Sequence, residues 1–458
     1  MHIIWEKIPL NKNLDREQAG YRFIETRANS KKGEFFMRPL DRVIGYEPIK
    51  EELYMIIDSF KNPQKYKALG ATPMRGIVFS GDPGIGKTLM AEALIEEVGW
   101  ESFVIRRNRT EEKFIDHIMT SFDEARQNAP SIILLEDADK YKQSMFSEEE
   151  YTTIQSCIDE CKEDVFVILT ANSLNNMPDS LLREGRFDKQ FHMKFPTGDD
   201  AAKIFEKYLA TKKVASDIDT YEIARCLQGY SCATLENLVN EASIVAAYRS
   251  SKLLEQCDLR KACMRLFFGT PETIEISDEN RKRVAAHEAG HALAAELLMP
   301  ESVNYVSIDS KSRNKLGLTS IYADMQNGHD FEWYENITRY ELAGKAASEI
   351  VLGEIDTGVA EDMREVYDNV RIIIDDFAAY EFGNWVHGDE TSQGVYENKD
   401  IATKTIIAKY YAETKKLLIK NRKILDAIID AVMEKGTLFY RDIQELIHLK
   451  QGGETNYE

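Results

Sequence analysis

Long apolar runs are absent from this sequence, and cysteine is scarce. No uninterrupted apolar stretch reaches the length of about 18 residues that a membrane-spanning helix needs, so we expect no membrane span. The N-terminus is charged by Glu6 and has no signal-peptide core. The six cysteines form no C-x-x-C pair, which makes a cysteine zinc site unexpected and predicts reduced thiols in a soluble, cytoplasmic protein.

The charge balance is acidic. Lysine and arginine total 58 and aspartate and glutamate total 78, a net charge of −20, which argues against a general nucleic-acid binder. The apolar content of 43% is typical of a globular protein. At 458 residues the chain is too long for one core, so two or three domains are expected.

The order of apolar patterns predicts an α/β part followed by an all-α part. Short β-branched runs alternate with helical patterns up to about residue 195, which indicates a mostly parallel sheet. The pattern then becomes helical, and one strand pair is predicted at 303–308 and 316–321. Gly269-Thr270-Pro271 is a breaker that predicts a linker. We expect an N-terminal extension, an α/β domain, a helical subdomain and a mainly helical C-terminal domain over residues 1–36, 37–195, 196–270 and 278–458.

A phosphate-binding loop is written at residues 81–88, which fit G-x-x-x-x-G-K-[ST] between a predicted strand and a predicted helix. Lys87 is expected to reach the β- and γ-phosphates and Thr88 to bind Mg²⁺. The alternative is a glycine-rich turn that binds nothing, and the flanking strand and helix argue against it. The predicted nucleotide-binding residues of the loop are Gly81, Asp82, Pro83, Gly84, Ile85, Gly86, Lys87 and Thr88.

Polar residues follow the next two predicted strands, where ligands collect in parallel sheets. Glu136 and Asp137 follow the first, and such acids hold Mg²⁺ and orient the attacking water. Asn172 follows the second and is placed to contact the γ-phosphate or that water. Arg183 and Arg186 are predicted to stabilise transition-state charge on a neighbouring subunit's nucleotide, although isolated arginines are more often solvated.

His287-Glu288-Ala289-Gly290-His291 fits H-E-x-x-H within an alanine- and leucine-rich stretch that should be helical. A spacing of four places both imidazoles on one helix face, where they can converge on one zinc ion. Glu288 is then the general base beside the metal-bound water. A third protein ligand is needed, and the residues alone leave the choice open among Glu349, Glu354, Asp356, Glu361 and Asp362.

Taken in this order, the motifs resemble the FtsH family of AAA-type ATP-dependent zinc proteases, over about residues 40–388. Asp41-Arg42-Val43-Ile44-Gly45 is similar to the adenine-contacting loop, which implicates Ile44 and Gly45. Residues 181–188 resemble the arginine-finger motif, 235–242 the lid helix and 342–349 the helix beside the zinc helix. Residues 357–362 resemble the segment with the third ligand, which would make Asp362 that ligand.

The resemblance implies an AAA-type ATPase with a lid, a zinc metallopeptidase domain, and ATP, Mg²⁺ and Zn²⁺ as cofactors. It also implies a homo-hexamer that threads unfolded protein into a peptidase chamber, here without the family's membrane anchor. The acidic pair is inverted, because the family has Asp then Glu. Asp137 is therefore one methylene short, a displacement of about 1 Å that can cost ~10²-fold in rate. Glu136 is one methylene longer than the aspartate of the family and compensates in part from the metal side. Slow ATP hydrolysis and no ATP hydrolysis are therefore both open.

Two further features have two readings each. Phe114 stands roughly where the family has its pore-loop aromatic, but Phe114, Ile118 and Phe122 are spaced by four, as in a core helix. Arg106, Arg107 and Arg109 would line the same pore or be ordinary exposed charges. The strand pair at 303–308 and 316–321 either offers an edge to an extended substrate or is a hairpin packed on the zinc helix.

The leading prediction is an enzyme that unfolds and degrades proteins with ATP. Its first rival is a nucleotide-binding scaffold or chaperone-like remodeller with weak hydrolysis, motivated by the inverted acidic pair. The second rival is an ATP-independent zinc oligopeptidase. Loss of cleavage without nucleotide distinguishes the leading prediction from the last, and measurable ATP turnover argues against the scaffold.

Overall fold

A computed structural model describes most of the chain. The described residues are 38–107, 114–141, 149–161, 164–175, 177–269, 277–309, 316–322, 330–354, 357–377 and 393–451. The predicted N-terminal extension, Asp356, Arg109 and most of the predicted linker lie outside them. Within the described residues, no helix is both long and apolar enough to cross a membrane.

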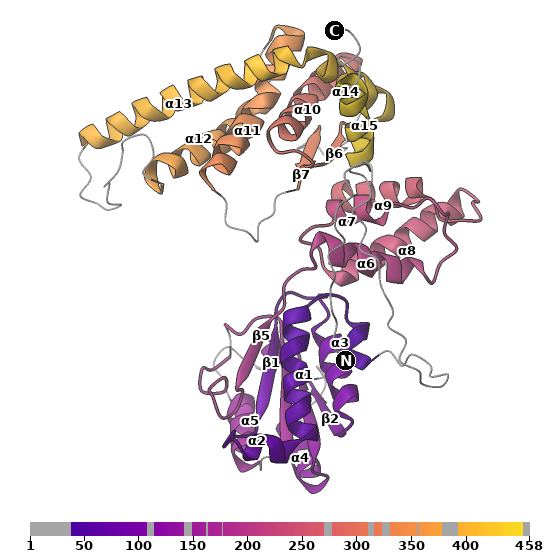
Figure 1. Ribbon diagram of the computed structural model, residues 1–458, viewed down its shortest axis with the longest axis vertical. Helices are drawn as coiled ribbons and strands as arrows, with labels where there is room; N and C mark the ends of the chain where they lie inside the picture. The colour runs from indigo at the N-terminus through magenta and orange to yellow at the C-terminus, as the bar shows by residue number, and fades with distance from the viewer. Residues whose placement is uncertain are drawn as a thin grey trace, which may run out of the picture. The chain divides into compact units, whose positions relative to one another are not determined.

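A five-stranded parallel sheet forms the core of the α/β part, in the order β2-β3-β4-β1-β5 (Figure 1). The first four strands fall where the apolar runs predict them, and β1, β3 and β4 are buried along their whole length. The short fifth strand was not predicted, because its sequence Lys-Gln-Phe-His has only one apolar residue. The strands are β1 Gly76–Ser80, β2 Glu101–Arg106, β3 Ser131–Glu136, β4 Val165–Ala171 and β5 Lys189–His192.

Helices cover both faces of this sheet. Alternate strand residues such as Ile77 and Ile168 pack against α1 and α3, and their neighbours such as Val78 and Leu169 pack against α4 and α5. Strands buried on both faces are apolar at most positions, which is why the sequence shows nearly continuous apolar runs rather than alternation. The helices are η1 Pro39–Arg42, α1 Glu47–Lys61, α2 Pro63–Lys67, α3 Lys87–Val98, α4 Phe114–Gln127, η2 Ala138–Lys140 and α5 Glu149–Glu160.

Four helices follow, as the helical pattern predicts. Three begin at side-chain caps: Thr197, Asp219 and Ser231 each accept a hydrogen bond from a backbone N–H in the first turn. Their apolar faces meet in one core that includes Phe205, Leu235 and Leu259. The helices are α6 Gly198–Leu209, α7 Thr220–Cys226, α8 Cys232–Tyr248 and α9 Gln256–Phe268.

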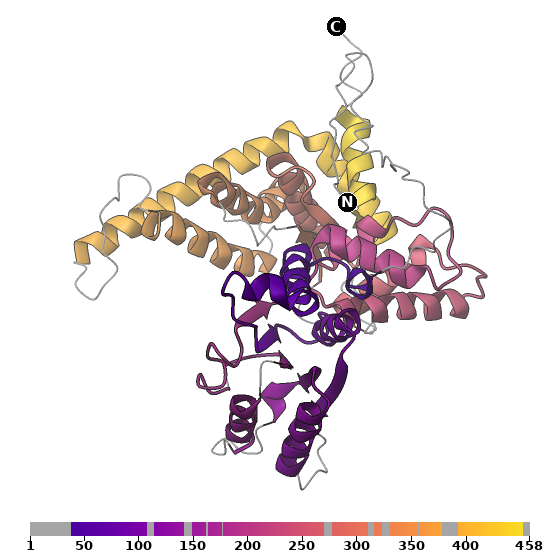
Figure 2. The ribbon, with the colours of Figure 1, turned by 60° about the horizontal axis from the view of Figure 1, so that its bottom comes forward.

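The C-terminal part is built on α10, capped by Ser277 and packed closely against α11. A Cβ atom on Gly290 would lie 2.5 Å from the carbonyl oxygen of Ala343, so only glycine permits this approach of the two helices. The long α13 runs beside α11 and α12 in Figures 1 and 2. The helices are α10 Asp278–Leu298, α11 Phe331–Leu352, η3 Thr357–Val359, α12 Ala360–Asp375, α13 Gln393–Lys420, α14 Arg422–Lys435 and α15 Tyr440–Gln451.

A three-stranded antiparallel sheet accompanies these helices, in the order β7-β6-β8. The predicted pair is present as β6 Val303–Ser307 and β7 Leu318–Ile321. The third strand, β8 Thr437–Phe439, was not predicted and pairs with β6. Because β6 is therefore central, only β7 of the predicted pair lies at an edge of the sheet that the described residues form.

Candidate metal centre and nucleotide site

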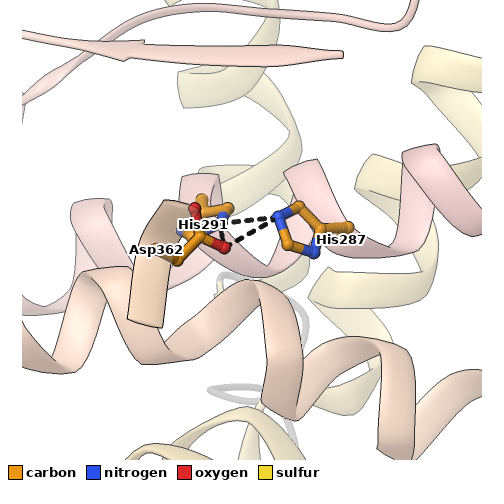
Figure 3. Close-up of side chains that lie close together, drawn as sticks. All are labelled: His287, His291 and Asp362. Carbon is orange, nitrogen blue, oxygen red and sulfur yellow. Dashed lines mark hydrogen bonds and ion pairs between the residues drawn. The ribbon is translucent and has the colours of Figure 1, made fainter. Parts of the chain in front are cut away.

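The three predicted metal ligands meet at one point (Figure 3). The Nε2 atoms of His287 and His291, both buried on α10, lie 3.1 Å apart. Asp362, near the start of α12, places Oδ2 3.1 Å from Nε2 of His287 and 3.5 Å from Nε2 of His291. Within the described part of the chain, this is the only group of three histidine, cysteine or acidic side chains with metal-site spacing.

These distances fit zinc. Ligands about 2.0–2.1 Å from a tetrahedral ion are separated from one another by roughly 3.3–3.4 Å. The three measured separations bracket that value. Two nitrogens and one carboxylate oxygen would supply three protein ligands to such an ion, the number that catalytic zinc sites use together with a water.

The tautomer of His291 is set by the backbone. Its Nδ1 lies 2.9 Å from the carbonyl oxygen of Tyr340 on α11. A carbonyl only accepts, so Nδ1 carries a proton in either charge state of the ring, and Nε2, which faces His287 and Asp362, is the nitrogen that can give up its proton to bind a metal ion. Sequence reasoning missed Tyr340, because its contact comes from a backbone atom of another helix.

The charges around the cluster favour a cation. Burial opposes the charge of His291, yet Asp362 and Glu288 together raise its pKa to about 9. Burial also opposes the charge of Asp362, but hydrogen bonds from the two histidines hold the pKa of that carboxyl well below its usual range. Burial raises the pKa of Glu341 on α11 to about 7, against the opposing effect of His291. Protons and metal ions compete for such a cluster.

Glu288 is held by a residue that the sequence did not indicate. The hydroxyl of Thr319, on β7, lies 2.7 Å from Oε2 of Glu288 and 3.0 Å from its backbone carbonyl. Both side chains are buried. A donor on one carboxylate oxygen fixes the orientation of the other, as a general base requires.

Two glycines make room for this arrangement. A Cβ on Gly344 would lie 2.4 Å from Nε2 of His291 and 2.7 Å from Nε2 of His287. A Cβ on Gly317 would lie 2.7 Å from Oε1 of Glu288. Any larger side chain at either position would displace the metal ligands or the base.

The other candidates for a third ligand are engaged elsewhere or lie outside the described residues. Glu349 contacts Tyr411 and Lys415, and Glu354 pairs with Arg283. Glu361 is exposed, and Asp356 is not among the described residues. The geometry thus singles out Asp362.

The phosphate-binding loop borders a cavity of about 580 Å³. Gly84 and Gly86 have φ of 77° and 101°, values that only glycine adopts readily, so the loop can curl ahead of α3. Lys87 is buried and its Nζ donates to the carbonyls of Gly81 and Asp82, at 2.7 and 2.8 Å, and to Oδ1 of Asn172, at 2.9 Å. Burial lowers the pKa of Lys87.

Thr88 and Glu136 form a pair suited to Mg²⁺. The Thr88 hydroxyl lies 3.1 Å from Oε1 of Glu136. Adjacent oxygens of an octahedral Mg²⁺ site, about 2.0–2.1 Å from the ion, are roughly 2.8–3.0 Å apart, so the two groups fit one ion. The other oxygen of Glu136 is engaged by Arg106, at 2.8 Å from Nε.

Asp137 lines the cavity in a left-handed backbone conformation with φ of 52°. Its Oδ2 lies 2.7 Å from Nζ of Lys140, another lining residue. Asn172 donates from its backbone and side chain to Asp139, at 3.1 and 3.3 Å, which holds it toward Lys87. Lys140 and Asp139 are further residues of this site that the sequence reasoning did not assign.

Apolar and aromatic side chains also line the cavity. Ile44 lines it, as the resemblance implies, together with Ile204 and Tyr208. Gly45 does not line the cavity; its φ of 78° and its approach to Asp200 give it a backbone role. The hydroxyl oxygen of Tyr46 lies 2.6 Å from the carbonyl oxygen of Lys194 and 3.1 Å from that of Ile85, so Tyr46 contacts the phosphate-binding loop.

Neither predicted arginine finger lines the cavity of its own chain. Arg183 is exposed. Arg186 forms a two-nitrogen contact with Asp159, at 2.9 and 2.6 Å. The guanidinium of Arg186 is thus already engaged within the chain, whereas the side chain of Arg183 is exposed to solvent.

Phe114 is a core residue. It is 3% exposed, and its ring makes an edge contact with Tyr141 at 4.9 Å. Arg107 lies over the same ring and pairs with the buried Glu150. Of the two sequence readings the core helix is therefore the one that the structure supports at Phe114.

Comparisons with known proteins cover both sites. Residues 77–195 match the family model of ATPases associated with various cellular activities (AAA), residues 217–261 an AAA+ lid domain, and residues 274–446 peptidase family M41. An ATP-dependent zinc metalloprotease FtsH of Thermobaculum terrenum is 30% identical over 444 residues, covering 89% of this chain and 68% of that protein. FtsH 1 of Thermomicrobium roseum is 31% identical over 445 residues, covering 89% and 67%. FtsH of Thermus thermophilus is 29% identical over 437 residues, covering 88% and 70%. With this identity across its ATPase, lid and peptidase parts, the chain belongs to the FtsH family.

Proposed function

We propose that this chain is an ATP-dependent zinc metalloprotease that unfolds and degrades protein substrates. The observation that carries the proposal is the convergence of His287, His291 and Asp362 beside Glu288, in a chain that also has a complete phosphate-binding loop. The names of the FtsH relatives support the same activity. Residues 37–195 and 196–270 would form the ATPase and its lid, 278–458 the peptidase, and 1–36 an N-terminal extension.

His287, His291 and Asp362 would hold the zinc, which when bound supplies a Lewis acid and lowers the pKa of a bound water. Glu288 accepts a proton from the attacking water and delivers it to the leaving amine. Thr319 keeps one Glu288 oxygen occupied, so that the other is the one that moves the proton. The buried surroundings exclude bulk water from this transfer.

An extended peptide fits the edge of β7. Within the described residues, β7 pairs with β6 on one side and with no strand on the other. A substrate strand can add there through main-chain hydrogen bonds, which are independent of sequence. Thr319 lies on the same strand, so a peptide at this edge would pass close to Glu288. This supports unstructured protein as the substrate.

In the ATPase part, Gly81, Asp82, Pro83, Gly84, Ile85, Gly86, Lys87 and Thr88 would hold the phosphates. Thr88 and Glu136 would hold Mg²⁺, Asp137 would orient the attacking water, and Asn172 would contact that water or the γ-phosphate. Ile44 would contact the base, with Gly45 shaping the loop. The lining of the cavity by residues 83–88, Ile44, Asp137 and Asn172 supports these roles.

The working assembly in this proposal is a homo-hexamer in the cytoplasm. Arg183 and Arg186 lie away from the cavity of their own chain, so an arginine finger would have to act on a neighbour. The mass of the assembly in light scattering, with and without ATP, tests the oligomeric state.

The cysteines bear on the compartment. All six are free thiols and four are buried, which fits a reducing compartment such as the cytoplasm.

The decisive experiment compares Glu288→Gln with Lys87→Ala on one unfolded protein, with and without ATP. We expect Glu288→Gln to abolish cleavage under both conditions and Lys87→Ala to reduce it strongly with ATP present. Cleavage that is undiminished without nucleotide would refute the coupling. Short-peptide cleavage alongside inert protein substrates would favour an ATP-independent oligopeptidase.

A nucleotide-binding scaffold or remodeller is the second candidate, because both acids of the hydrolysis pair contact cations of the chain itself. Steady-state ATP turnover separates the two. Turnover that is measurable in the wild type and lost in Arg183→Ala or Arg186→Ala would count against the scaffold.

A further inference from the structure

The carboxylate of Glu136 accepts hydrogen bonds from two side chains at once. Arg106 ends β2 directly opposite Glu136, which ends β3. Its Nε donates to Oε2 of Glu136 at 2.8 Å, and its Nη2 donates to the same oxygen. The hydroxyl of Thr88 donates to Oε1 at 3.1 Å. Both oxygens of the acid proposed to serve Mg²⁺ are therefore already hydrogen-bonded within the chain.

A guanidinium and Mg²⁺ compete for such a carboxylate. Both are cations that bind its oxygens, and Mg²⁺ at Oε1 would stand only a few ångströms from the guanidinium on Oε2. Like charges at that separation repel strongly, even at the dielectric of a protein surface. An ion at Oε1 is therefore disfavoured while the guanidinium stays on Oε2.

The surroundings let Arg106 leave. Its side chain is 60% exposed, whereas that of Glu136 is 8% exposed, so only the arginine can move into water without opening the fold. Glu136 most of all, and Asp137 and Glu92 to a smaller extent, raise the pKa of Arg106. The guanidinium therefore competes with the ion as a cation. Of the other nearby cations, Arg107 is paired with Glu150 and Lys140 with Asp137.

We propose that Arg106 is an internal competitor of Mg²⁺ at the nucleotide site, which binds Glu136 and must be displaced when Mg²⁺–ATP arrives. The inference rests on the proposed nucleotide function and adds a residue that sets its metal requirement. Arg106 raises the concentration of divalent ion at which the site fills. It thereby keeps the charge of Glu136 neutralised until nucleotide and metal are present together.

The test measures metal binding directly, using Mn²⁺ as a paramagnetic substitute for Mg²⁺. The full chain is titrated with Mn²⁺, with and without a non-hydrolysable ATP analogue, and free Mn²⁺ is counted by electron paramagnetic resonance. We expect Arg106→Ser to bind analogue-dependent Mn²⁺ about two- to fivefold more tightly than the wild type, the range of a largely exposed ion pair. Arg106→Lys keeps the charge but loses the two-nitrogen contact, so its affinity should be intermediate.

Arg126→Gln is the matched control. Like Arg106, Arg126 pairs with acidic side chains, but these are Asp123 on α4 and Glu160 on α5, away from the cavity. Its loss removes the same charge and should leave the Mn²⁺ affinity unchanged. An equal gain in Arg126→Gln would overturn the proposal, because net charge alone would then explain the effect.

An unchanged or weaker Mn²⁺ affinity in Arg106→Ser also overturns the proposal, since Arg106 would then support Glu136 rather than compete for it. The proposed function fails separately. If neither the wild type nor Arg106→Ser gains Mn²⁺ binding from the analogue, and Lys87→Ala equals both, the site does not bind metal–nucleotide and both proposals fall. Binding gained only in Arg106→Ser supports both.

Discussion

The metal centre and the nucleotide site treat their carboxylates in opposite ways. Asp362 faces two imidazole nitrogens across 3.1 and 3.5 Å, and the cluster favours an added cation. Glu136 and Asp137 instead face Arg106 and Lys140. The peptidase site gives up only a proton when it binds its ion, whereas the ATPase site has to exchange side-chain cations of the chain for one from solution. We infer from this difference that binding of the metal ion regulates the ATPase site but not the peptidase site.

Glu288→Gln gives the largest expected effect and tests the peptidase side of the comparison. Glutamine keeps the shape and can still contact Thr319, but it cannot accept the proton of the attacking water. General acid–base groups contribute ~10²–10⁴-fold, so we expect cleavage of a short peptide to fall about 10³-fold. Zinc content, measured by atomic absorption, should stay at the wild-type level.

Glu349→Gln is the control for this change, because Glu349 contacts Lys415 and Tyr411 rather than the metal cluster. It should cleave the peptide at the wild-type rate. A Glu288→Gln protein that retains more than a tenth of the activity would show that another group moves the proton.

Asp137→Glu tests the nucleotide side and should increase a rate. The added methylene carries the carboxylate about 1 Å further, and misplacement of that size costs ~10²-fold. We therefore expect ATP turnover to rise up to about 10²-fold, measured as phosphate release at saturating Mg²⁺. Asp123→Glu, on the surface of α4, adds the same methylene and should change nothing. Unaltered turnover in Asp137→Glu would mean that contact with Lys140, not length, limits the acid.

Local patterns predicted much of both sites. The strands β1, β3 and β4, the loop at 81–88 and the histidine pair each depend on residues close in sequence, so their spacing carries the information. Asp362 stands 71 residues beyond His291, and only the family resemblance distinguished it from other acids. By charge alone, each of those acids is an equally good candidate for the third zinc ligand.

Contacts between elements that are distant in the chain could not be predicted from sequence patterns. β8 has three residues, and its pairing with β6 joins positions some 130 residues apart, so no local pattern marks it. The Arg106–Glu136 contact depends on β2 and β3 being neighbours in a particular register. The same applies to Phe114, whose burial against Tyr141 depends on how α4 packs. These are properties of tertiary packing rather than of residue spacing.

Gly344→Ala sharpens the idea that the metal centre is pre-arranged. The new Cβ would lie 2.4 Å from Nε2 of His291, closer than atoms in contact allow, so the ligands must shift. We expect zinc affinity to fall by about 30-fold, within the ~10–100-fold range for disturbed ligand orientation, in titrations against a chelator. Gly394→Ala, at an open position on α13, is the matched control and should bind zinc normally. Normal zinc binding by Gly344→Ala would show that the helices separate easily and that the centre is not rigid.

Thr319→Val gives the smallest expected effect and separates orientation of the base from binding of the metal. Valine fills the space of threonine but cannot donate to Glu288, so the carboxylate loses the contact that fixes it at 2.7 Å. Loss of a comparable orienting contact costs ~10–100-fold, and because Glu288 is not a metal ligand we expect the lower end, about tenfold in kcat for a short peptide with KM nearly unchanged. Thr319→Ser keeps the hydroxyl and should recover most of the rate. Since Thr319 also lies on the edge strand β7, a rise in KM without a fall in kcat would indicate instead that its main role is to bind the peptide.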